Sequence, residues 1–105
     1  MIFITGPLYS GKRTYAAKLG GRVIYDVQDM AKENTELSQL ADSLSEYDIV
    51  IATEIGGGIV PLDKAEREQR ERAGRLACLL ASRADTVISM FCGIPRAIKG
   101  ELPEC

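Results

Sequence analysis

Four short apolar runs rich in β-branched residues, separated by stretches with helical spacing, most constrain the fold of this chain. The runs are 2–5 (IFIT), 22–27 (RVIYDV), 48–53 (DIVIAT) and 86–92 (TVISMFC). Helices are expected over residues 11–19, over 29–45 as one or two segments, and over 64–84. Strands that alternate with helices predict βαβ crossovers and a parallel sheet covered on both faces. The sequence therefore predicts an α/β fold, a three-layer sandwich with a small, mainly parallel sheet.

The length and charge of the chain suit one ordinary domain. It has 105 residues, 46% of them hydrophobic and 27% charged, and a formal net charge of -2. This slightly negative net charge does not indicate binding to nucleic acid or to an anionic membrane. No apolar run approaches the roughly 20 residues of a membrane span. We expect a single domain over residues 1–105, with an irregular tail from about residue 94.

The cysteines and the missing histidines narrow the chemistry. Cys78, Cys92 and Cys105 form neither a C-x-x-C pair nor an even set, and no signal peptide is recognisable, which favours a reducing cytoplasm. Cys78 and Cys92 are expected to be small buried side chains. The chain has no histidine, so histidine metal sites, Ser–His pairs and phosphohistidine chemistry are excluded for it.

Residues 6–14, GPLYSGKRT, have the spacing G-x-x-x-x-G-K of a phosphate-binding loop. In such a loop, backbone N–H groups and a helix N-terminus point at the phosphate. Gly6 and Gly11 would allow tight bends, and Lys12 would reach the β- and γ-phosphates. A chance match in a strand–helix turn is the alternative, but the position directly behind the first strand favours a real loop. Segments 6–12 and 53–58 and Gly93 should meet at the carboxyl edge of the sheet.

The residue after the lysine departs from the motif. A Ser or Thr hydroxyl normally coordinates Mg²⁺ there, but this position holds Arg13, which has no acceptor atom. Thr14 lies about 100° further around the helix and would substitute poorly. Two interpretations of Arg13 stay open: its guanidinium lies against the phosphates, or it is a solvated surface side chain.

Four segments of the second half carry a family resemblance. They are TEIGGGIVP (53–61), RERAGR (70–75), LASRADTV (80–87) and CGIPRAIK (92–99). Together with the loop, they resemble the adenosylcobinamide kinase / adenosylcobinamide-phosphate guanylyltransferase family of cobalamin biosynthesis. Its members carry a G-x-x-x-S-G-K-S loop and later an N-E-V-G-x-G-I-V-P segment, in the same order. The likeness covers residues 1–26 and 48–99.

The resemblance implies a P-loop NTPase-like fold, a nucleotide and a corrinoid substrate. It assigns the phosphates of ATP or GTP to a set of loop and helix residues. These are Gly6, Ser10, Gly11 and Lys12, with Arg13 and Thr14 beside them. It makes Lys12 and Glu54 the catalytic residues. The family forms trimers, so a homo-oligomer is expected, with the helix over 64–84 as a candidate contact.

The resemblance also implies a magnesium site. It places Glu54 near Mg²⁺ or its waters, and a carboxylate at the carboxyl end of a strand can hold such a hard cation. The alternative for Glu54 is a partner of a loop or of a helix dipole. We expect Glu54 and Thr14 to form the metal site, weakened by the presence of Arg13.

Several departures from the family limit the expected activity. The family transfers guanylate through a histidine in the segment that here spans only 28–47 and contains no histidine. Thr53 replaces the Asn of the family. We therefore expect a nucleotide-binding protein that keeps at most the kinase half-reaction, phosphoryl transfer to a corrinoid alcohol. One alternative is a non-catalytic nucleotide- or phosphate-binding protein with a regulatory or assembly role. Another is a structural remnant whose loop binds nothing.

Overall fold

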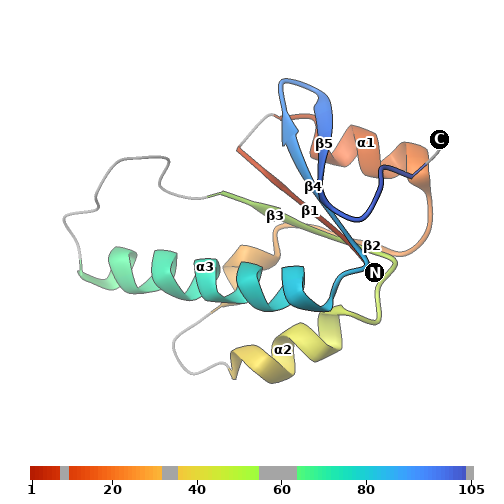
Figure 1. Ribbon diagram of the computed structural model, residues 1–105. Helices are drawn as coiled ribbons and strands as arrows, with labels where there is room; N and C mark the ends of the chain where they lie inside the picture. The colour runs from red at the N-terminus through yellow and green to blue at the C-terminus, as the bar shows by residue number, and fades with distance from the viewer. Residues whose placement is uncertain (8–9, 32–35, 55–63, 104–105) are drawn as a thin grey trace.

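The protein forms a five-stranded sheet in the order β2-β3-β1-β4-β5 (Figure 1). The computed structural model describes residues 1–7, 10–31, 36–54 and 64–103. The strands are β1 Ile2–Gly6, β2 Val23–Ile24, β3 Ile49–Thr53, β4 Thr86–Phe91 and β5 Ile94–Lys99. The helices are α1 Lys12–Leu19, the 3-10 helix η1 Val27–Met30, α2 Leu37–Leu44 and α3 Lys64–Arg83.

The N-terminal strand β1 lies at the centre of the sheet. It pairs in parallel with β3 on one side and with β4 on the other. Strand β2 extends the parallel part beyond β3, and β5 pairs antiparallel with β4. The predicted α/β class with a mainly parallel sheet is confirmed.

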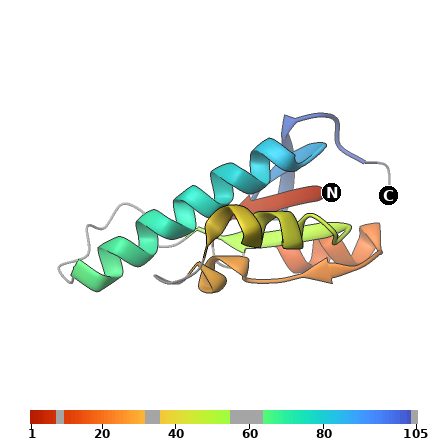
Figure 2. The ribbon, with the colours of Figure 1, turned by 90° about the horizontal axis from the view of Figure 1, so that it is seen from below.

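Helices cover both faces of the sheet and create two cores. Successive side chains of a strand point to opposite faces, and in β1 Phe3 packs with residues of η1, α2 and α3, whereas Ile4 packs with Ala16 of α1. Figure 2 shows α2 and α3 lying side by side, and Figure 1 shows α1 away from them, on the other side of the strands. The three-layer arrangement places the loop between β1 and α1 at the carboxyl edge of the sheet.

The second strand is shorter than the sequence predicts. A strand over 22–27 was expected, but β2 ends at Ile24, and Asp26 adopts a left-handed backbone conformation with a φ of 54°. A residue in that conformation cannot continue a strand. Val27 then begins η1 and is buried with Gln28. The helical region expected over 29–45 corresponds to the end of η1 and to α2.

The expected irregular tail is wrong, because residues 94–99 form strand β5. Phe91 pairs with Ile94, so Cys92 and Gly93 make a two-residue turn, and both have a positive φ. Such turns match the twist of a hairpin. Pro95 does not disrupt β5, since β5 lies at the edge of the sheet, where proline is tolerated.

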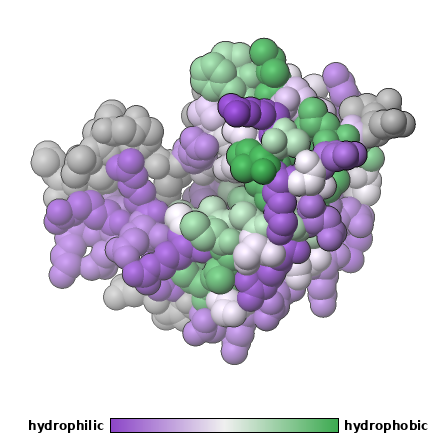
Figure 3. All heavy atoms as spheres, viewed as in Figure 1, coloured by the Kyte–Doolittle hydropathy of each residue, from purple (hydrophilic) through white to green (hydrophobic). Residues whose placement is uncertain are grey.

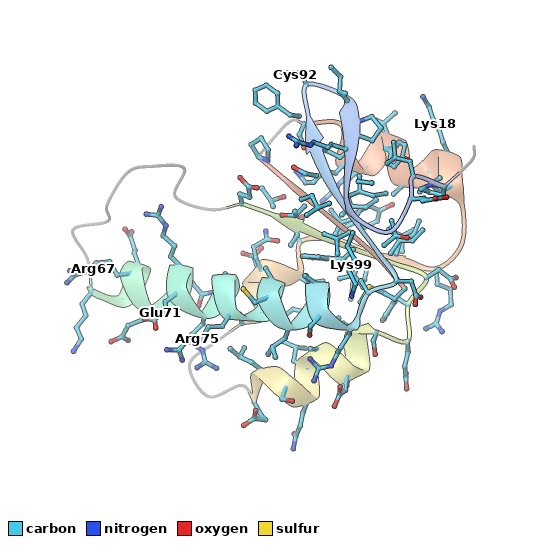
Figure 4. The ribbon with its side chains drawn as sticks, in the orientation of Figure 1. Lys18, Arg67, Glu71, Arg75, Cys92 and Lys99 are labelled. Carbon is cyan, nitrogen blue, oxygen red and sulfur yellow. The ribbon has the colours of Figure 1, made fainter. Side chains whose placement is uncertain are left out.

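The cysteines are also placed differently from the prediction. Cys78 on α3 is exposed rather than buried, and so is Cys92 at the tip of the β4–β5 hairpin (Figure 4). Cys105 lies outside the described residues. The hairpin tip presents Phe91 and Ile94, which are 65% and 68% exposed, and Figure 3 shows apolar side chains gathered at the top of this view. Burial of Cys92 is prevented because it occupies the turn itself.

Candidate functional site

The phosphate-binding motif lies where the sequence predicts it, between β1 and α1. Lys12 is the first residue of α1 and is only 6% exposed. Its Nζ donates hydrogen bonds to the carbonyl oxygen of Pro7 at 2.6 Å and to the Oγ of Ser10 at 3.1 Å. The ammonium group is therefore held inside the loop by neutral acceptors, which phosphate oxygens could replace with a stronger, charge-assisted bond.

The burial of Lys12 changes its acidity. Desolvation lowers the pKa of Lys12 below the ordinary 10.5, and nearby Arg13 lowers it further, whereas Asp26 and Glu54 act in the opposite direction. The two carboxylates and the guanidinium therefore belong to one electrostatic environment. Lys12 therefore loses its positive charge at a lower pH than an ordinary lysine does.

We expect the titration of the Lys12 side chain to show this shift. In the protein with ¹³C-dimethylated lysines, the Lys12 signal should titrate below the ordinary lysine pKa of 10.5. Raising the pH through this lower pKa removes the positive charge, so anion binding should weaken in the same range. A Lys12 signal that titrates at or above 10.5 would contradict the burial argument.

Three strand ends meet around the loop. The N–H of Glu54, after β3, donates to the carbonyl oxygen of Gly6 at 2.9 Å. The N–H of Gly93, after β4, donates to the carbonyl oxygen of Ser10, also at 2.9 Å. Gly11 has a φ of 90°, which strongly favours glycine. The predicted meeting of these segments is confirmed for the described residues, and 55–58 lie outside them.

A cavity of about 450 Å³ opens at this point. Its lining residues are Ser10, Gly11, Lys12, Arg13, Thr14, Asp26, Ile51 and Thr53. Five of the residues expected to bind phosphate are thus brought together, while Gly6 lies behind the loop against Met90 and Ser10. The volume suits a group of the size of a ligand's phosphate chain and sugar.

Arg13 is an exposed surface side chain, as the second of the two interpretations expects, but it is also ion-paired. Its Nη2 lies 2.6 Å from Oδ2 of Asp26, and its guanidinium stacks over the ring of Tyr25 at 4.8 Å. The Arg13 side chain is 66% exposed. The hydroxyl of Thr53 donates to the other oxygen of Asp26 at 3.3 Å. Arg13 is therefore an ion-paired side chain on the wall of the cavity, next to Lys12.

Glu54 lies in a neighbouring, smaller cavity of about 230 Å³. Thr53 lines both cavities and forms the boundary between them. Gln28 fixes this boundary, since its Oε1 accepts the N–H of Thr53 at 2.9 Å and its backbone oxygen accepts Nε2 of Gln69 at 3.2 Å. The side chain of Glu54 itself is exposed.

The described side chains fit a magnesium ion poorly. Thr14 and Glu54, the expected ligands, line different cavities. Asp26 shares the first cavity with Thr14, but its carboxylate is engaged by Arg13 and Thr53. Over residues 1–7, 10–31, 36–54 and 64–103, no three His, Cys, Asp or Glu side chains gather as a metal site. A metal here would depend on the phosphates of a ligand for most of its oxygen ligands.

The sequence reasoning missed Asp26 as a site residue. Ligands bind beyond the carboxyl ends of parallel strands, but the strand expected over 22–27 has Asp26 inside it. In the structure β2 ends at Ile24, so Asp26 lies beyond the strand at that edge. The expected strand therefore concealed Asp26 as a site residue.

Comparison with known proteins gives two matches. The family model for cobinamide kinase / cobinamide phosphate guanyltransferase matches residues 22–98, a range that begins after the phosphate-binding loop. The bifunctional adenosylcobalamin biosynthesis protein CobP of Pseudomonas aeruginosa is 32% identical over 76 residues, which cover 72% of this chain and 44% of that protein. The chain thus spans less than half the length of this relative. Among the described residues, no helix has the length and apolar character needed to cross a membrane.

Proposed function

This chain belongs to the cobinamide kinase / cobinamide phosphate guanyltransferase family, and on that premise we propose that it binds ATP or GTP through the loop of residues 6–12. The observation that carries the proposal is the buried Lys12 ammonium, held within the loop at the N-terminus of α1. Backbone N–H groups, the helix N-terminus and Lys12 together form an anion site that needs no further group.

The proposed activity is at most the kinase half-reaction of the family. In it, the hydroxyl oxygen of a corrinoid alcohol attacks the γ-phosphorus, the bond to the β–γ bridging oxygen breaks, and the proton of the hydroxyl is released. Lys12 would stabilise the charge that develops on the β- and γ-phosphate oxygens. Guanylyl transfer through a histidine is not proposed, because the chain contains no histidine.

A second candidate function is nucleotide or phosphate binding without catalysis, in a regulatory or assembly role. Arg13 favours it, since an ion-paired guanidinium stands at the position where the motif carries a metal-binding hydroxyl. Elements that stabilise charge in phosphoryl transfer can each contribute about 10³-fold to the rate. A weakened magnesium site therefore lowers turnover far more than binding. A homo-oligomer that uses α3, and a cytoplasmic location, stay predictions.

Calorimetric titration of ATP and GTP, with Mg²⁺ and with EDTA, tests the proposal. We expect the protein to bind either nucleotide in EDTA, and to bind it no more tightly when Mg²⁺ is added. In EDTA, Arg13→Ser should bind nucleotide about tenfold more weakly than the parent, because one charge-assisted contact is lost. Nucleotide binding by this variant should also become dependent on Mg²⁺. Formation of a corrinoid phosphate from cobinamide would then favour the kinase over the non-catalytic alternative.

Arg22→Ser is the matched control for this experiment. It removes the same charge from an arginine that stacks on Tyr47 and does not line the cavity. Its nucleotide affinity should stay within about twofold of the parent, because Arg22 precedes β2, at the opposite edge of the sheet from the cavity. The absence of a binding signal with millimolar ATP and GTP would reject both candidate functions.

A further inference from the structure

An acidic side chain lies where an anion site should be electropositive. Asp26 lines the same cavity as Lys12 and Arg13, and its charge acts on Lys12. A carboxylate in this position opposes the approach of phosphate. Asp26 also adopts the left-handed conformation, with a φ of 54°, which few residues other than glycine adopt and which clusters at functional sites.

The contacts of Asp26 show what its carboxylate does. One oxygen holds Nη2 of Arg13 at 2.6 Å, and the other accepts the hydroxyl of Thr53 at 3.3 Å. The side chains of Arg13 and Asp26 are 66% and 41% exposed, so their ion pair is accessible to a competing anion. Pairs at such exposure contribute little to stability and can exchange partners at small cost.

Resting on the proposed phosphate site, we propose that Asp26 is an internal counter-anion that holds Arg13 until a metal-free polyphosphate takes over its guanidinium. Arg13 lies in the first turn of α1, directly after Lys12, and both line the cavity. A guanidinium binds phosphate oxygens in a two-pronged geometry that a lysine cannot provide. The exchange leaves the carboxylate of Asp26 hydrogen-bonded to Thr53.

The exchange selects a class of ligand. A metal-free di- or triphosphate chain is long enough to contact Lys12 and Arg13 at once. Its several negative charges can outcompete the single carboxylate of Asp26 for the Arg13 guanidinium. A single phosphate gains less, because it satisfies fewer of these donors. A magnesium complex competes less well for Arg13, because the ion neutralises two of the charges on the chain. The preferred ligand is thus the metal-free polyphosphate part of a nucleotide, or pyrophosphate itself.

Calorimetry with pyrophosphate in EDTA at low salt tests this inference. Asp26→Asn should bind pyrophosphate about tenfold more tightly than the parent, because the competing charge is removed. Asparagine tolerates the left-handed conformation, so the fold should be kept. Glu46→Gln changes the net charge equally at an exposed residue that precedes β3, at the opposite edge of the sheet from the cavity, and it should raise the affinity far less than Asp26→Asn does. Inorganic phosphate should gain less than pyrophosphate from Asp26→Asn.

A second measurement follows the exchange in the unaltered protein. The ¹⁵N signal of the Arg13 guanidinium should move on addition of pyrophosphate, while that of Arg22 should not. If Asp26→Asn leaves the affinity unchanged, or if the Arg13 signal stays in place, the counter-anion role is wrong. The proposed phosphate site can stand although the counter-anion role fails. It stands if pyrophosphate binds the parent protein and does not bind Lys12→Ala. If the parent binds neither pyrophosphate nor nucleotide, both proposals fail.

Discussion

Replacement of Lys12 by alanine should weaken the binding of ATP or GTP by about a hundredfold, close to 3 kcal/mol for a charged hydrogen-bonding group. The Lys12 ammonium is buried within the loop, and phosphate oxygens would replace its two neutral acceptors, Pro7 and Ser10. The remaining backbone N–H groups would still attract the anion, so weak binding at millimolar nucleotide should persist. Isothermal titration calorimetry measures the loss directly.

Lys18→Ala is the control for this prediction. Lys18 lies in the last turn of the same helix and points away from the molecule in Figure 4. The variant loses the same charge and keeps α1 helical, since alanine is the best helix former. Its affinity should stay within about twofold of the parent. Equal losses in the two variants would show that general charge, and not the loop, attracts the nucleotide.

The second large effect concerns stability. Gly6→Ala should destabilise the protein by about 3 kcal/mol, the upper end of the cost of overpacking. A Cβ atom on Gly6 would lie 2.4 Å from the carbonyl oxygen of Met90 and 2.9 Å from Oγ of Ser10. Relief of these contacts requires the backbone of β4 or of the loop to move. Urea unfolding followed by circular dichroism measures the change.

Gly74→Ala makes the same change within α3 and should have the opposite sign. A Cβ atom at Gly74 would meet nothing within 4 Å, so the added methyl group is accommodated. Alanine is about 1 kcal/mol more favourable than glycine in a helix interior, and we expect a gain of up to that amount. If Gly6→Ala were as stable as the parent, the close packing of β1 against β4 would be refuted.

The elements that were predicted correctly have strong local patterns. The runs that became β1, β3 and β4 are apolar and β-branched, and the apolar spacing in the second half of α3 marks the buried Leu76 and Leu80. The place of the loop followed from a physical rule, since carboxyl ends of parallel strands share one edge. These features depend on short stretches of sequence or on topology alone.

The features that were missed depend on single residues or on distant pairs. The β4–β5 hairpin depends on Cys92 taking a positive φ, and cysteine is not among the residues that mark such turns. The end of β2 depends in the same way on Asp26. The pair of Arg13 and Asp26 joins side chains from two segments, so no local spacing could have predicted it. The position of the loop in the fold was therefore predicted, whereas the ion pair of Arg13 with Asp26 was not.

The central position of β1 also bears on how the protein is made. Its two neighbours, β3 and β4, come from the middle and the later part of the chain, and the loop gains its backbone partners from Glu54 and Gly93. A ribosome therefore completes the loop of residues 6–12 long before it supplies the segments that hold it. Until Gly93 has emerged, the apolar β1 is without one of its neighbours and exposed to wrong pairing. The loop of residues 6–12 can take its place at the edge of the sheet only after β4 has joined β1.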